Sequence, residues 1–138
     1  MKSYLLIDDD DIIQFVHRKV IERFDPDAAI HVAFSVDEAL AHLLSLTESS
    51  MPDVIFLDIN MPMRNGFDFL KDIRTRYRPV YNILRERTKV FLLTSSVNPR
   101  DMQSAEQCVL IERLLSKPLS TAVLEGLAAA HTLSREEG

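Results

Sequence analysis

Short apolar runs alternate with amphipathic stretches along the whole chain. Five of these runs have the length and composition of β-strands, and they are Tyr4–Ile7, Ala29–Phe34, Val54–Leu57, Val90–Leu93 and Arg113–Leu115. Most of the runs are apolar at nearly every position. This pattern predicts strands that are covered on both faces, which is typical of parallel sheets.

The amphipathic segments between the runs predict helices, because their apolar residues recur at helical spacing. We expect five helices, near residues 13–24, 36–44, 67–74, 100–107 and 121–133. The first helix is predicted to turn inward the face formed by Ile13, Val16, Val20 and Phe24. Asp11 is the expected N-cap of the first helix, and either Ser35 or Asp37 that of the second. Strands and helices in this order predict five β–α units in a doubly wound α/β sandwich.

One connection does not fit this scheme. Residues 77–89, with the sequence YRPVYNILRERTK, separate the third helix from the fourth strand. The segment either extends that helix past Pro79 or forms a charged excursion at the surface.

Polar side chains follow the strands at the points where they end. The acidic run Asp8–Asp11 follows the first strand, Asp58 the third, Thr94–Ser96 the fourth and Lys117 the fifth. In a parallel five-stranded sheet of order 2-1-3-4-5, the ligand site lies outside the carboxyl ends of strands one and three. We therefore expect these acids, hydroxyls and the lysine to converge.

Such a group of side chains could form a site in which an aspartate carboxylate carries a phosphoryl group. Neighbouring carboxylates repel one another and have raised pKa values unless a cation lies between them. Mg²⁺ (or Mn²⁺) binds one or two carboxylates together with phosphate oxygens, and lysine binds phosphate as a point charge. Aspartate is a known nucleophile for phosphoryl transfer, a reaction that depends mainly on positioning and charge neutralisation.

The stretches LLIDDD, DVIFLDINMPMRNGFDFL, VFLLTSS and LLSKPL together resemble the receiver domain of two-component response regulators. The resemblance covers nearly the whole chain, with the motifs in the same order and at similar spacing. It implies a flavodoxin-like fold with the sheet order 2-1-3-4-5. It also implies a stand-alone receiver, similar to the chemotaxis regulators, that occupies residues 1–138 with no output domain.

The resemblance assigns a metal site and a phosphoacceptor. Asp58 is the implied phosphoacceptor and a metal ligand. Asp9 binds Mg²⁺ directly, Asp8 binds it through a water, and Asn60 contributes its backbone carbonyl. The side chains of Asn60 and Ser96 are implied to tune autodephosphorylation.

Two further residues are implied to contact the phosphoryl group, namely Thr94 and Lys117. The Lys117–Pro118 peptide bond is implied to be cis. Many family members carry an aromatic residue three positions before the lysine, where this chain has Leu114. We expect the coupling between Thr94 and this position to be altered, so that the switch runs mainly through loop movement.

Composition excludes several classes of protein. With 138 residues and a net charge of −5, the chain fits one domain and lacks the basic face that nucleic-acid binding needs. The single Cys108 excludes an internal disulfide framework. No apolar stretch reaches membrane-spanning length and the N-terminus does not resemble a signal peptide, so we expect a cytoplasmic protein without membrane partners. The four histidines lack metal-ligand spacing and are expected at the surface or partly buried: His17, His31, His42 and His131.

The sequence thus predicts a signalling module rather than an enzyme. It would accept a phosphoryl group from a histidine kinase or a histidine phosphotransfer protein and act on a downstream protein target. An intermediate phosphorelay shuttle is an open alternative. A phosphatase of the haloacid-dehalogenase type is disfavoured, because Asn60 stands where those enzymes need an acid. A receiver that only binds partners, or a flavin-binding protein, fits the acidic cluster less well.

Overall fold

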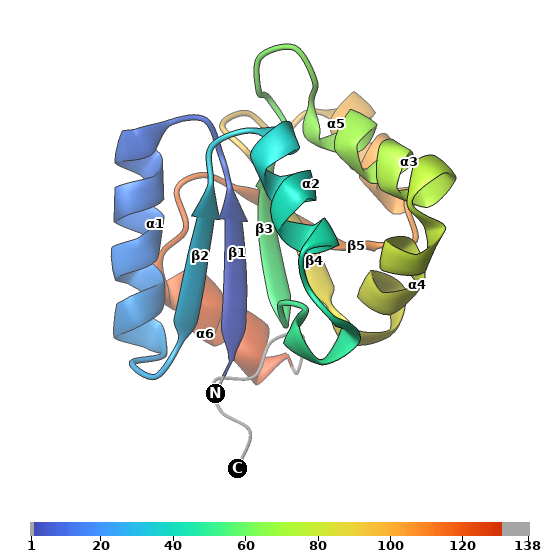
Figure 1. The fold of residues 1–138 in the computed structure, drawn as a ribbon. Helices are drawn as coiled ribbons and strands as arrows, with labels where there is room; N and C mark the ends of the chain where they lie inside the picture. Colours follow the sequence, from blue (N-terminus) through green and yellow to red (C-terminus); the bar gives the residue numbers. More distant parts are fainter. Residues whose placement is uncertain (1, 131–138) are drawn as a thin grey trace.

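The computed structural model describes residues 2–130, and its centre is a single sheet (Figure 1). The strands are β1 (Ser3–Ile7), β2 (Ala29–Ala33), β3 (Val54–Asp58), β4 (Lys89–Thr94) and β5 (Ile111–Ser116). The helices are α1 (Asp11–Phe24), α2 (Val36–Leu44), α3 (Gly66–Arg76), α4 (Arg78–Arg87), α5 (Pro99–Glu106) and α6 (Thr121–Ala129), and a short 3₁₀ helix spans Glu48–Ser50. All neighbouring strands are parallel. Their order is β2-β1-β3-β4-β5, which confirms the predicted topology.

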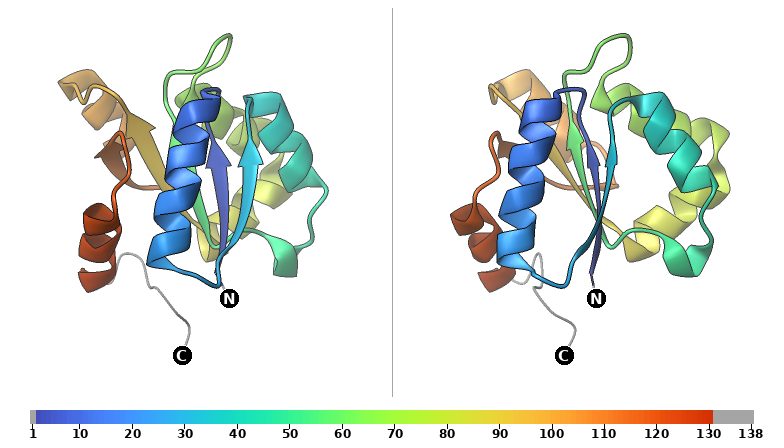
Figure 2. Two further views of the ribbon diagram at one scale, coloured as in Figure 1. Left: turned by 90° about the vertical axis from the view of Figure 1, so that its left-hand side faces the viewer. Right: turned by 60° about the vertical axis from the view of Figure 1, so that its left-hand side comes forward.

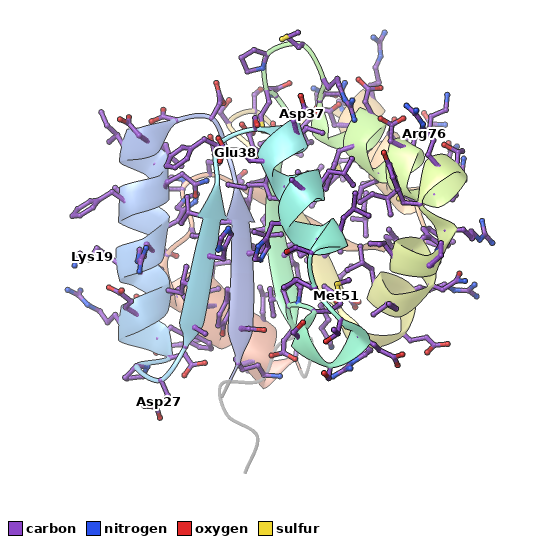
Figure 3. The ribbon with its side chains drawn as sticks, viewed as in Figure 1. Lys19, Asp27, Asp37, Glu38, Met51 and Arg76 are labelled. Atoms are coloured by element: carbon purple, nitrogen blue, oxygen red, sulfur yellow. The ribbon has the colours of Figure 1, made fainter. Side chains whose placement is uncertain are left out.

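Helices cover both faces of the sheet. Figure 2 shows α1 and α6 on one side and α2, α3 and α4 on the other. Successive side chains of a strand point to opposite faces, so Leu5 packs under α2 and α3 while Leu6 packs under α1 and α6. Charged side chains such as Lys19 and Arg76 lie on the outside, whereas Met51 is buried (Figure 3).

The three central strands have the coverage that their composition predicts. All residues of β3 are buried, and nearly all of β1 and β4. The same prediction is wrong for β2 and β5, in which most residues are exposed or half-buried. These two strands form the edges of the sheet, so their outer sides have no neighbouring strand to cover them.

Helix α1 differs from its prediction in two respects. Its N-cap is Asp10, not Asp11, because Asp10 has extended backbone and its carboxylate accepts from the amides of Ile12 and Ile13. Its inward face is also rotated from the predicted one, and the buried positions are Gln14, His17, Ile21 and Phe24. Of the four residues that we predicted to face inward, only Phe24 is buried, and Val16 is 38% exposed. For α2, Ser35 is the N-cap, and its hydroxyl accepts from the amide of Glu38.

The connection 77–89 forms a separate helix, α4, so neither interpretation of this segment was right. Helix α3 ends at Arg76, and Tyr77 is both its C-cap and the N-cap of α4. Pro79 lies in the first turn of α4, where a missing amide costs no hydrogen bond. Three residues of α4 are buried against the sheet, which makes it part of the core. The described residues therefore form six helices rather than five.

At the C-terminal end, α6 begins at Thr121 as predicted and ends at Ala129. The predicted end at residue 133 lies outside the described residues, as does His131. None of the helices in the described part of the chain has the length and apolar character needed to cross a membrane.

Candidate functional site

Three carboxylates meet at the carboxyl ends of β1 and β3. These two strands are paired with Ile7 opposite Leu57, so the residues that follow them emerge side by side. Asp8, Asp9 and Asp58 each offer an oxygen, and these oxygens lie within 4.8 Å of one another. Asp8 and Asp58 are each only 2% exposed, while Asp9 is open to solvent. The predicted convergence of these acids is therefore present.

Lys117 joins the two buried carboxylates. Its Nζ lies 2.7 Å from Oδ2 of Asp8 and 3.2 Å from Oδ1 of Asp58. The pairing of Ser116 with Thr94 brings the end of β5 to β4, and the Lys117 amide donates to the Thr94 carbonyl at 2.8 Å. The Lys117–Pro118 peptide bond is cis, as expected.

The charges of this cluster do not balance, since the Lys117 ammonium pairs with the two carboxylates of Asp8 and Asp58 and the carboxylate of Asp9 lies beside them. Burial, and then the charge of Asp8, raises the pKa of Asp58 from 3.8 to about 6. For Lys117, burial acts to lower the pKa, but the contacts with Asp8 and Asp58 outweigh it and the pKa is raised. A hard divalent cation fits this donor set, because it takes oxygen ligands and relieves the repulsion between them.

The loop after Asp58 folds back on the end of β3. The Gly66 amide donates to the Ile59 carbonyl at 2.9 Å. A Cβ on Gly66 would lie 2.9 Å from the backbone oxygen of Asp58, so only glycine fits here. Between these ends, the Arg64 amide donates to the Pro62 carbonyl at 2.8 Å across Met63, whose φ is 71°. This is a γ-turn of the strained kind with positive φ.

Asn60 lies in this loop, two residues after the phosphoacceptor candidate Asp58. Its amide donates to Oδ1 of Asp58 at 3.2 Å, and its side chain is exposed. The contact fixes the direction of the Asp58 carboxylate. The part of Asn60 in metal binding and in hydrolysis stays a prediction.

Thr94 is fully buried at the end of β4, and its hydroxyl is engaged within its own turn. Oγ1 donates to the Ser96 carbonyl at 3.1 Å and accepts from the Ser96 amide at 3.2 Å. Thr94 thus shares the carboxyl edge of the sheet with the acids, but the described bonds of its hydroxyl go to Ser96. Its expected contact with a phosphoryl group stays a prediction, as does the role of Ser96.

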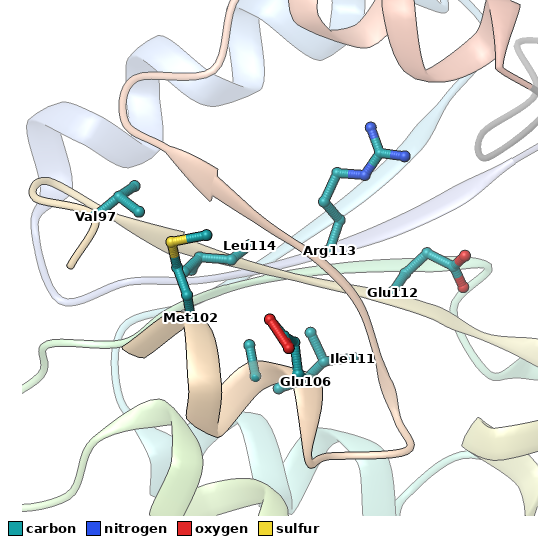
Figure 4. Close-up of a pocket in the computed structure, with 8 residues that line it drawn as sticks. Val97, Met102, Glu106, Ile111, Glu112, Arg113 and Leu114 are labelled. Atoms are coloured by element: carbon teal, nitrogen blue, oxygen red, sulfur yellow. The ribbon is translucent and has the colours of Figure 1, made fainter. Parts of the chain in front are cut away.

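Leu114 lines a cavity of about 300 Å³ between α5 and β5 (Figure 4). Met102 and Val97 supply other apolar walls, and Glu106 and Arg113 also line the cavity. The absence of an aromatic ring at this position is consistent with open space there. The altered coupling to Thr94 stays a prediction.

Two polar side chains that the sequence did not place near the site lie on the buried face of α1. Nε2 of Gln14 lies 3.0–3.1 Å from the carbonyls of Leu6, Asp8 and Ala33, at the ends of β1 and β2. Nε2 of His17 accepts the Leu119 amide at 3.1 Å. His17 is 1% exposed, so the expectation that it lies at the surface or only partly buried is wrong. The spacing of residues 14, 17, 21 and 24 fits one helical face and was the available signal.

The structure is a doubly wound α/β domain in which a lysine bridges two members of an acidic cluster at the carboxyl ends of the strands. A sequence model of the response regulator receiver domain matches residues 4–129. The chain belongs to the response regulator receiver domain family. Signalling receivers of this family are not classical enzymes.

Solved structures agree with this assignment. A two-component response regulator from Cytophaga hutchinsonii is 32% identical, with a TM-score of 0.83, covering 94% of this chain and 96% of that one. A response regulator receiver protein from Dyadobacter fermentans is 28% identical, with a TM-score of 0.79, covering 94% and 97%. Among curated proteins, the probable C4-dicarboxylate response regulator DctR of Halalkalibacterium halodurans is 34% identical over 73 residues. That match spans 53% of this chain and 30% of the relative's length.

Proposed function

We propose that this receiver domain accepts a phosphoryl group on Asp58 from a histidine kinase or a histidine phosphotransfer protein, and that the phosphorylated form binds a downstream protein target differently. The single observation that carries the proposal is the position of the Asp58 carboxylate. It lies at the end of β3 within 4.8 Å of oxygens of Asp8 and Asp9 and 3.2 Å from the Lys117 ammonium.

Mg²⁺, or Mn²⁺ in its place, is the proposed cofactor. Asp8, Asp9 and Asp58 would hold it, together with the backbone carbonyl of Asn60. When bound, the cation neutralises negative charge on the transferred phosphoryl group. The raised pKa of Asp58 supports this proposal, because its causes, burial and then the negative charge of Asp8, both disfavour the ionised carboxylate, and a bound cation would offset them.

The chain's own residues would then carry the transfer. An oxygen of ionised Asp58 attacks the phosphorus, an acyl phosphate bond forms, and the bond to the donor's leaving group breaks. The Lys117 ammonium balances charge that arrives on the phosphoryl oxygens. Thr94 would exchange its bonds to Ser96 for a bond from its hydroxyl to the phosphoryl group.

Loss of the phosphoryl group would follow by attack of water. We infer that Asn60 and Ser96 control the approach of this water, because the exposed side chain of Asn60 and the turn at Ser96 flank the carboxyl edge of the sheet. Conversion between the two forms would move the segment around Ser96 rather than an aromatic ring at position 114.

Mass spectrometry of the intact protein tests the proposal. The protein is incubated with Mg²⁺ and acetyl phosphate or phosphoramidate, and we expect one added phosphoryl group per chain. The addition should be absent in Asp58→Asn and present in Asp11→Asn, a matched control in the same acidic run that is exposed and outside the cluster. An unchanged mass in the wild-type protein would refute phosphorylation as the function of this site.

A further inference from the structure

Buried His17 links two parts of the chain that are far apart in sequence. It lies on the inward face of α1, and its bond to the Leu119 amide spans 102 residues. Both side chains are buried, with His17 1% and Leu119 2% exposed. A buried polar side chain is costly unless it is hydrogen-bonded. This bond therefore explains how a histidine is accommodated among the apolar residues of α1 and α6.

The residue that His17 binds lies two positions after Lys117. The Lys117 segment is held on one side by β4, through the Lys117 amide and the Thr94 carbonyl. On the other side it is held by α1, through the Leu119 amide and His17. The two anchors restrict the backbone from which the Lys117 side chain reaches Asp8 and Asp58. Without the second anchor, this backbone would lose the hydrogen bond that ties Leu119 to α1.

The bond requires that Nε2 of His17 accepts, so the ring must be neutral. Burial, opposed by the charge of Asp8 and aided by that of Lys117, lowers the pKa of His17 from 6.5 to about 4. The ring is therefore an acceptor throughout the neutral range. A leucine at this position would fill a similar volume but would leave the buried Leu119 amide without its partner.

We propose that His17 is a positioning residue that acts through Leu119 to hold Lys117 against Asp8 and Asp58. This inference rests on the proposed function, because it assigns His17 to the phosphorylation of Asp58. His17 itself is not proposed to touch the phosphoryl group or the metal ion.

The test compares His17→Leu, which removes the acceptor, with His17→Gln, whose amide oxygen can take the place of Nε2. The measurement is the rate constant of phosphorylation by phosphoramidate at saturating Mg²⁺, followed by intact mass. We expect His17→Leu to react about ten-fold more slowly, since small displacements of a reacting group are costly, and His17→Gln to regain most of the rate. Ile21→Ala serves as the matched control, because it truncates a side chain on the same buried face of α1 and in the same core cluster as Leu119, but leaves the His17 acceptor of the Leu119 amide in place.

A double-mutant cycle shows whether His17 acts through Lys117. If it does, His17→Leu has no further effect on the rate in a Lys117→Ala background, because residues that act as a unit are not additive. A full ten-fold effect in that background would overturn the inference, as would a normal rate in His17→Leu or an equal rate loss in Ile21→Ala. If His17→Leu does not fold, His17→Asn replaces it, because its shorter amide does not reach Leu119.

The two proposals fail separately. A wild-type protein that takes up no phosphoryl group refutes the proposed function. A wild-type protein that is phosphorylated on Asp58 while the His17 variants react normally refutes only the role of His17.

Discussion

Replacement of Asp58 by asparagine should stabilise the metal-free protein, although it removes the proposed phosphoacceptor. A carboxyl whose pKa is raised from 3.8 to about 6 in the folded state is ionised at neutral pH at a cost of about 3 kcal/mol. Asparagine has the same shape, carries no charge, and keeps an oxygen that can accept from the Asn60 amide. We expect Asp58→Asn to raise the free energy of unfolding by about 1–3 kcal/mol at pH 8, because Lys117 retains its contact with Asp8.

The stability that Asp58→Asn gains over the wild-type protein should increase as pH rises. Below about pH 4, Asp58 is protonated in both the folded and the unfolded chain, so its replacement changes little. Between about pH 4 and pH 6 the folded state holds the proton more tightly than the unfolded state. The stability of the wild-type protein therefore falls with rising pH relative to the variant, and the full difference is present above pH 6.

Urea unfolding in the presence of a chelator measures the free energy of unfolding of the wild-type and variant proteins at pH 4 and at pH 8. Since the chain has no tryptophan, circular dichroism is the suitable signal. A thermal melt should show a rise of about 3–5 °C per kcal/mol for a domain of this size. Asp11→Asn, in the exposed part of the same run, should leave stability nearly unchanged. An Asp58→Asn protein that is no more stable than wild type at pH 8, or equally stabilised at both pH values, would refute the reasoning.

Three other predictions follow from the same site and its loop. Mg²⁺ affinity, measured by calorimetry, should rise as pH increases to about 6 and then level, because Asp58 must lose its proton to bind the cation; an affinity independent of pH would contradict this. Gly66→Ala should lower the free energy of unfolding by about 1–3 kcal/mol, because its Cβ would lie 2.9 Å from the Asp58 backbone oxygen; unchanged stability in urea would show that the loop can move. Asn65→Ala should cost about 1 kcal/mol in the same assay, because Asn65 caps α3 by accepting from the Asp68 amide; Asn65→Asp, which keeps a capping oxygen, should cost less.

An element of the fold was predictable where the composition of one short segment is enough to identify it. The apolar composition of β3 identifies a strand buried on both faces, and the topology then follows from the regular alternation of strands and helices. The edge strands β2 and β5 have similar runs, but their exposure depends on their place in the sheet. Pro79 misled the reading of residues 77–89, because the same residue that ends one helix also suits the first turn of the next.

The acids of the site were predictable because each directly follows a strand, so topology alone brings them together. The two buried polar residues next to the site, Gln14 and His17, were not predictable. Gln14 and His17 look like ordinary polar positions of a surface helix until the inward face of α1 is known. Most residues of the predicted inward face lie one position before the residues that are buried in the structure. An error of one residue in a helix rotates the assigned face by about 100°, which is enough to place both side chains in solvent.

The partners of these two residues show why a local pattern could not correct the error. Gln14 binds carbonyls at the ends of two strands, and His17 binds an amide beyond the fifth. A polar side chain can be expected in the core when its hydrogen-bond partner is known. A partner that is distant in sequence comes close only when the chain folds, so the sequence does not reveal it. Neighbouring carboxylates repel one another, so contacts that hold the ends of the strands and the Lys117 segment in place favour the arrangement seen here. Gln14 and His17 on the buried face of α1 supply two such contacts, one to the Asp8 carbonyl and one to the Leu119 amide.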